Sequence, residues 1–176
     1  MSMINKFDKT IFEKAQQIVN KWDFSLAIDK LCEREDWNKE RAEKAVADYR
    51  IYMAATKALN GEQMVPNGDI DEIWHMHILD TRAYLKDCLE LFGGFLHHYP
   101  YFGRLSDENR QEWLDAQNES QQLWADLTGK MLYSATLTAP NCPQACPCNI
   151  DEDEPLLAID NQYIKNFASS IMQKVA

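Results

Sequence analysis

Basic residues are scarce in this chain, which has 18 lysines and arginines against 28 aspartates and glutamates and a formal net charge of −10. Nucleic acids and anionic membranes are bound through basic patches, so this composition argues against both as partners. The sequence also lacks an apolar run of the ~18 residues that a membrane-spanning helix needs. Its first residues lack the apolar core of a signal peptide. These absences predict a cytoplasmic protein and leave only a protein partner open.

Several catalytic motifs are absent as well. The sequence contains no glycine-rich phosphate loop, no Gly-x-Ser-x-Gly and no His-Glu-x-x-His. No reaction can therefore be assigned from a motif, and whether the chain is an enzyme stays open. What the chain does have is 45% apolar residues, including five tryptophans, which is enough for a folded core. Its 176 residues predict one domain.

Helical patterns dominate the sequence. A capping box at Thr10 predicts the first long helix, and a continuous helix is expected from Asp69 to Phe92, where Gly93 and Gly94 end it. The expected fold is all-α, a single-domain orthogonal bundle of about five to six helices with a Cys/Pro-rich loop near the C-terminus. The helices are expected to begin at Thr10, Ser25, Asn38, Asp69, Ser106 and Asn161.

Three segments are expected along the chain. Residues 1–138 would form the helical domain that carries the histidines, and residues 139–160 would form a loop rich in cysteine, proline and acidic residues. Residues 161–176 would form a C-terminal helix that packs on the same domain. Its apolar positions recur at helical spacing, at Tyr163, Ile164, Phe167, Ile171 and Val175.

All four histidines lie between His75 and His98, and they make the clearest candidate site. Histidine is the commonest metal ligand, and imidazole together with carboxylate suits zinc or iron. We therefore predict a zinc or iron site made from these histidines, with three further residues close enough to support the ligands. The predicted ligands are His75, His77, His97 and His98, and the supporting residues are Asp71, Asp80 and Tyr84.

The spacing of the first histidine pair separates their roles. On a regular helix, residues two apart point about 160° away from each other, so His75 and His77 would hold one ion together only across a distorted turn. His77 lies at the centre of the predicted buried face, where both ring nitrogens need partners. We expect His97 or His98 to be that partner, because the Gly93–Gly94 break lets the chain turn back. Asp71, one turn before His75, is expected to orient its ring.

Two alternatives to a histidine metal site stay open. In the first, the histidines form a hydrogen-bonded polar core in a non-catalytic interaction or scaffold module. In the second, Cys142, Cys146 and Cys148 form a thiolate metal site or a redox site, since clustered thiolates suit soft ions. Their Cys-x-x-x-Cys-x-Cys spacing departs from the usual Cys-x-x-Cys of zinc sites, and a fourth ligand is missing.

A longer motif surrounds the histidines. The segment from Asp71 to Tyr84, with its Trp74-His-x-His77, and the downstream Leu96-His-His-Tyr-Pro100 resemble the family called glycine-rich domain-containing protein-like. The match covers about residues 10–105 and is tight over residues 69–100. The resemblance implies a helical domain, and it singles out Asp71, Trp74, His75, His77, Tyr84 and one of His97 and His98 without naming a reaction.

The larger members of that family carry extra domains, including a glycine-rich tail, and an RNA-binding role is suggested for them. This chain departs from those members. It has only six glycines and no glycine-rich tail. An RNA-binding role is therefore not carried over, and the acidic net charge argues the same way.

Overall fold

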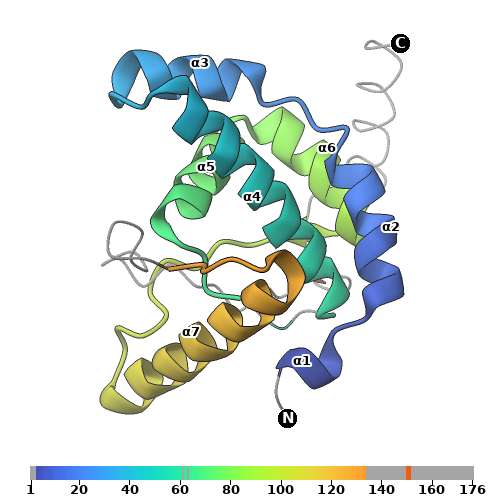
Figure 1. The fold of residues 1–176 in the computed structure, drawn as a ribbon, viewed down its shortest axis with the longest axis vertical. Coiled ribbons are helices and arrows are strands. Elements are labelled where there is room, and N and C mark those ends of the chain that lie inside the picture. The colour runs from blue at the N-terminus through green and yellow to red at the C-terminus, as the bar shows by residue number, and fades with distance from the viewer. Residues whose placement is uncertain (1–2, 61, 63, 134–149, 152–176) are drawn as a thin grey trace, which may run out of the picture.

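The computed structural model describes residues 3–60, 62, 64–133 and 150–151 of the chain. Helices account for nearly all the regular structure in that part, so the all-α prediction is confirmed (Figure 1). The helices are α1 (Met3–Lys6), α2 (Lys9–Val19), α3 (Ser25–Arg34), α4 (Lys39–Ala58), α5 (Gly68–Leu79), α6 (Thr81–Phe92) and α7 (Asp107–Thr128). Two short strands, β1 (Phe95–Leu96) and β2 (Ile150–Asp151), complete the described elements.

Several predicted helix ends are confirmed with their physical basis. Asn38 caps α4, because its side-chain oxygen accepts a hydrogen bond from the Arg41 amide at 2.8 Å. Ser106 caps α7 in the same way through the Asn109 amide. Gly93 ends α6 with a φ of 80°, a left-handed conformation that glycine adopts without a Cβ clash.

Two predicted helix starts are wrong by a few residues. Asp8, rather than Thr10, caps α2 by accepting a hydrogen bond from the Ile11 amide. Asn67, rather than Asp69, caps α5 through the Ile70 amide. In both cases an Asp or Asn two residues earlier in the chain accepts a hydrogen bond from the amide three residues after it. The helix therefore begins earlier in the chain than predicted.

The continuous helix expected from Asp69 to Phe92 is in fact two helices that meet at Asp80. This residue leaves the helical region with φ −86° and ψ 75°, and its side-chain oxygen accepts a hydrogen bond from the Ala83 amide. Asp80 thus ends α5 and caps α6. The break lets α6 turn and pack against α5.

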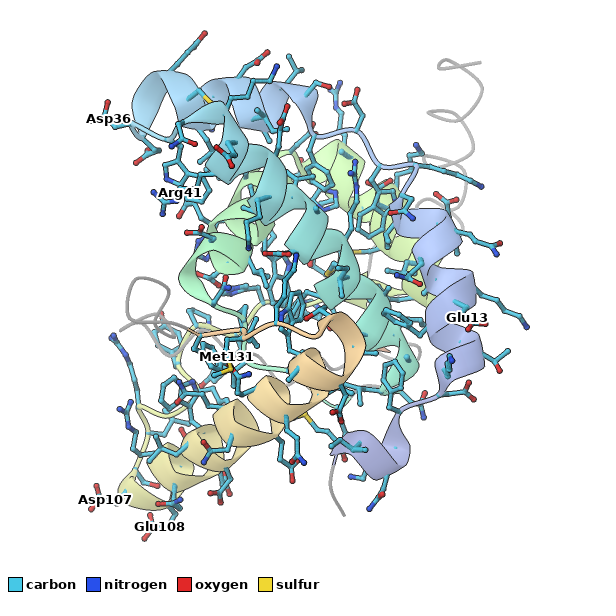
Figure 2. The ribbon with its side chains drawn as sticks, in the orientation of Figure 1. Glu13, Asp36, Arg41, Asp107, Glu108 and Met131 are labelled. Carbon is cyan, nitrogen blue, oxygen red and sulfur yellow. The ribbon has the colours of Figure 1, made fainter. Side chains whose placement is uncertain are left out.

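The core is built around α4, which lies between α2, α3 and α5 (Figure 1). Apolar residues recur at helical spacing along α4, and those from Ala42 through Tyr49 to Met53 are buried. Charged side chains such as Glu13, Asp107 and Glu108 project outward from the ribbon (Figure 2). None of the described helices combines the length and the apolar character needed to cross a membrane.

The strands β1 and β2 form one antiparallel ladder, in which Phe95 pairs with Asp151 and Leu96 with Ile150. The sequence predicts a loop over residues 139–160, and β2 is a two-residue strand within that segment. The rest of the predicted loop, with Cys142, Cys146 and Cys148, lies outside the described residues. The predicted helix at residues 161–176 also lies outside them, and the three expected segments of the chain stay predictions.

Candidate functional site

Asp71, His75 and His98 come together where the connector between α6 and α7, residues 93–106, passes α5. Asp71 and His75 lie one turn apart on α5, so their side chains share a face. His98 arrives from the segment after β1, with its Nε2 atom 3.3 Å from Oδ1 of Asp71. The other carboxylate oxygen, Oδ2, lies 3.7 Å from Nδ1 of His75. One ligand atom from each of the three residues falls within 4.8 Å of the other two.

The surroundings of this Asp71–His75–His98 cluster hold its rings in place. Asp71 is buried, the side chain of His98 is only 8% exposed, and that of His75 is 32% exposed. The rings of His75 and His98 have centroids 4.9 Å apart, and the edge of Trp74 packs on His98 at 4.5 Å. The exposed part of the His75 side chain gives an ion or a small molecule a route to the cluster from solvent.

The charge around the cluster is acidic. Burial raises the pKa of the neighbouring Glu72 carboxyl above its ordinary value, while His75 opposes that rise and Asp71 adds to it. Asp69, at the start of α5, is paired with the Arg41 guanidinium at 2.8 Å. Carboxylates therefore outnumber cationic side chains along this stretch of α5, an arrangement that favours a bound cation.

His77 occupies a different place, inside the bundle. Only 3% of it is exposed. Its Nδ1 atom lies 3.0 Å from the Tyr49 hydroxyl, and its Nε2 atom lies 3.2 Å from Oδ2 of Asp87. Four aromatic rings surround the imidazole with centroids 5.0–5.9 Å away, those of Trp22, Phe24, Tyr49 and Tyr84.

The expected pairing of His77 with His97 or His98 is therefore wrong. The helix break at Asp80 brings Asp87 of α6 to the imidazole, so a carboxylate and a phenol satisfy the ring nitrogens instead of a second imidazole. The predicted divergence of His75 and His77 is confirmed, since one belongs to the Asp71 cluster and the other to the core.

His97 and Asp80, two other predicted site residues, lie outside the Asp71–His75–His98 cluster. His97 is half-buried with its ring 4.9 Å from that of Phe95, and it is not a member of the described three-residue cluster. Of the two adjacent histidines, it is His98 that reaches Asp71. Asp80 is exposed and caps α6, so its role is in the fold.

Tyr84, on α6, links α5 to β1, the strand that precedes His98. Its buried hydroxyl accepts a hydrogen bond from Nε1 of Trp74 at 2.9 Å and donates one to the Leu96 carbonyl at 2.5 Å. Leu96 precedes His98 by two residues, so this chain of bonds fixes the connector against α5. The neighbouring Cys88 is a protonated thiol at neutral pH, because burial raises its pKa to about 12.

Two buried polar residues were missed by the sequence reasoning, Tyr49 and Asp87. A usable signal exists for Asp87, because an acidic residue stands within the buried stripe of α6 between Tyr84 and Leu91. A carboxylate at such a position needs a buried partner. Which partner it finds depends on the packing of α6 against α5.

We expect Tyr84→Phe to destabilise the protein by about 1–3 kcal/mol, because the indole N–H of Trp74 and the carbonyl of Leu96 would both lose a buried partner. Urea unfolding followed by circular dichroism measures this effect. Tyr101→Phe is the matched control, since Tyr101 is 55% exposed and its change should cost little. Equal midpoints for the two variants would contradict the bonding role of Tyr84.

Comparison with known proteins gives a family for the chain. The UCP032817-like family model matches residues 14–119, which is more than half of the sequence. That description names no activity. No curated protein and no solved structure shows a significant match. The resemblance to the glycine-rich domain-containing protein-like family is wrong as an assignment, because the family model that matches is a different one. The chain belongs to the UCP032817-like family.

Proposed function

We propose that the protein binds a divalent zinc or iron ion through Asp71, His75 and His98. The observation that carries the proposal is the convergence of one carboxylate and two imidazoles, whose ligand atoms lie within 4.8 Å of one another. They come from two separate parts of the chain, so the tertiary fold, and not the local sequence alone, assembles this donor set.

The donor set suits the chemistry of these ions. Zinc takes imidazole nitrogen and carboxylate oxygen, and two histidines with one carboxylate are the usual ligands of non-haem iron. Three protein ligands leave coordination positions for water or another molecule. The imidazoles must be neutral to bind an ion, so binding would release any protons that they hold.

The cluster also has the rigid support that a metal site needs. Asp71 and His75 project from a helix whose start is capped by Asn67. The Trp74 ring packs against His98, and the Trp74–Tyr84–Leu96 chain of hydrogen bonds holds the connector that bears it. Ligands held in this way need little reordering when an ion binds.

A second candidate function uses the same contacts without an ion. Asp71 lies within hydrogen-bond distance of His98, at 3.3 Å, so the cluster could serve only to tie the connector to α5 in a scaffold or interaction module. The two functions differ in what a chelator does. Removal of a bound metal would lower the melting temperature, whereas a purely hydrogen-bonded cluster would not respond.

Metal analysis of freshly purified protein tests the proposal, together with zinc titration of the metal-free form by calorimetry. We expect one ion per chain in the wild type. His98→Ala should weaken binding by more than the roughly 10–100-fold that loss of an outer partner of a metal ligand costs. His97→Ala is the matched control, because it removes the adjacent imidazole, which lies outside the cluster.

The outcomes of this experiment separate the two candidates. Binding that survives in His97→Ala and is lost in His98→Ala supports the metal site. A wild type without bound metal, or equal zinc affinity in both variants, refutes it and leaves the scaffold function.

A further inference from the structure

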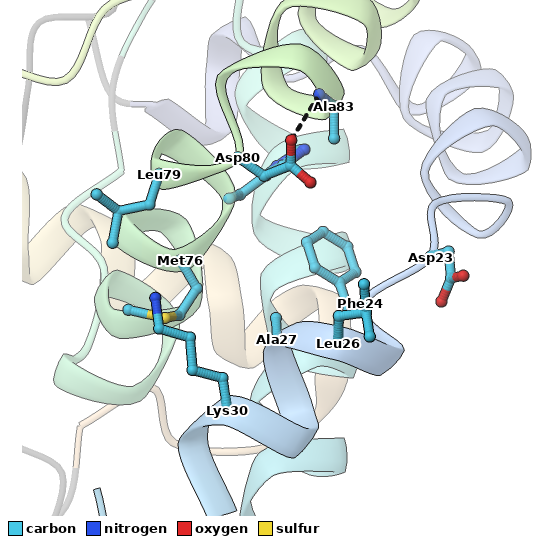
Figure 3. A pocket seen from close by; sticks show the side chains of 10 residues that line it. Asp23, Phe24, Leu26, Ala27, Lys30, Met76, Leu79, Asp80 and Ala83 are labelled. Carbon is cyan, nitrogen blue, oxygen red and sulfur yellow. Dashed lines mark hydrogen bonds between the residues drawn. The ribbon is translucent and has the colours of Figure 1, made fainter. Parts of the chain in front are cut away.

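A groove lies between the start of α3, the end of α5 and the start of α6 (Figure 3). Its volume is about 480 Å³, within the range of small-molecule sites. Leu26 and Leu79 on its rim are 82% and 65% exposed, an unusual state for large apolar side chains that face one hollow. The apolar lining consists of Phe24, Leu26, Ala27, Met76, Leu79 and Ala83.

The polar groups of the groove favour a cationic occupant over an anionic one. The carboxylates of Asp23 and Asp80 line it together with a single ammonium, that of Lys30. Asp23 stays ionised, because hydrogen bonds from Ser25 hold the pKa of its carboxyl below the usual value. His77 also lines the groove, but both of its ring nitrogens are already bonded to Tyr49 and Asp87. The groove therefore offers an apolar surface with acidic flanks and no free catalytic group among the residues described.

The chain itself carries a segment with the complementary pattern. Residues 161–176 have apolar side chains at helical spacing, with Tyr163, Phe167 and Ile171 four residues apart. The charged residues in this segment are Lys165 and Lys174, and it contains no acidic residue. On a helical wheel Lys174 lies within the apolar stripe, between Tyr163 and Phe167, whereas Lys165 lies on the opposite face, so only Lys174 could face the carboxylates of a groove.

We propose that residues 161–176 dock as an amphipathic helix in this groove, with the apolar stripe on Leu26, Met76 and Leu79. Helix-in-groove binding of this type places successive turns of an apolar stripe into one hollow. An isolated helix of this length is marginal in water, so docking would supply the stability that the segment lacks on its own.

The connecting chain is long enough for this arrangement. Asp151 pairs with Phe95, which directly follows the C-terminal end of α6, whereas the groove lies at the N-terminal end of that helix. With 12 residues, α6 is about 18 Å long at the usual helical rise. Residues 152–160 can extend to about 30 Å, which covers that span.

Hydrogen–deuterium exchange of the full-length protein tests the proposal, read out on peptides from residues 161–176. We expect these amides to be protected in the wild type. Leu79→Glu on the groove and Phe167→Asp on the segment should each make them exchange at least about tenfold faster. Leu105→Glu is the matched control, because Leu105 is 67% exposed and does not line the groove. It should leave the protection unchanged.

Three results would overturn the docking. The first is rapid exchange of residues 161–176 in the wild type. The second is protection that Leu79→Glu leaves intact, which would place the segment elsewhere. The third is a dimer in light scattering that Leu79→Glu dissociates while the segment stays unprotected, which would assign the groove to a second copy of the chain. None of these results depends on metal binding, so the docking and the metal site can fail separately.

Discussion

His77→Ala is expected to destabilise the protein by about 3–5 kcal/mol, the usual effect of leaving a buried charge without its partner. The Asp87 carboxylate would remain buried without its imidazole, and the Tyr49 hydroxyl would lose its 3.0 Å contact. The ring would also leave a cavity among the aromatic side chains of Trp22, Phe24 and Tyr84. Unpaired polar groups and an empty cavity both penalise the folded state.

Chemical denaturation with urea measures this loss directly, and a matched histidine is available. His97→Ala removes the same side chain from a half-buried position beside Phe95, and we expect it to cost far less. The change in His77→Ala should also be the same with and without a chelator, because neither of its ring nitrogens contacts the Asp71 cluster. A loss below about 1 kcal/mol would show that the Tyr49–His77–Asp87 chain contributes little to stability.

The second prediction with a large effect distinguishes Asp71 from Asp87, two buried aspartates that contact histidine, by how zinc changes the stability of each variant. With free zinc at 100 times the Kd, the wild type should gain about 2.7 kcal/mol of stability, since the ion binds the folded state. Asp71→Asn should abolish this gain, because an amide is a poor ligand for zinc compared with a carboxylate. Asp87→Asn should keep the gain, although its folded state starts about 1–3 kcal/mol less stable.

Thermal unfolding of the three proteins with and without zinc gives the comparison. Each variant is judged by its own change on adding zinc, so a lower starting stability does not distort the result. Zinc that binds to the chain's cysteines affects all three proteins alike, because the substitutions leave those residues unchanged. The same gain in Asp71→Asn as in the wild type would exclude Asp71 as a ligand.

Local sequence determined the helices and several of the residues that cap them. The apolar stripe of α4 and the Asn38 and Ser106 caps follow from spacing and side-chain chemistry within a few residues. The break at Asp80 was hidden, because the apolar pattern on either side of it continues in helical phase. A cap inside a longer helical pattern is hard to distinguish from an exposed polar residue.

For the candidate site, the sequence alone determined that the histidines lie in one short stretch and that His75 and His77 face different directions, since helical geometry sets that angle. Only the tertiary structure decided the partners. The turn at Asp80 presents Asp87 to His77, and the segment after β1 delivers His98 to Asp71 and His75. Such contacts join residues 10 to 27 positions apart, and they depend on how whole helices pack rather than on any local preference.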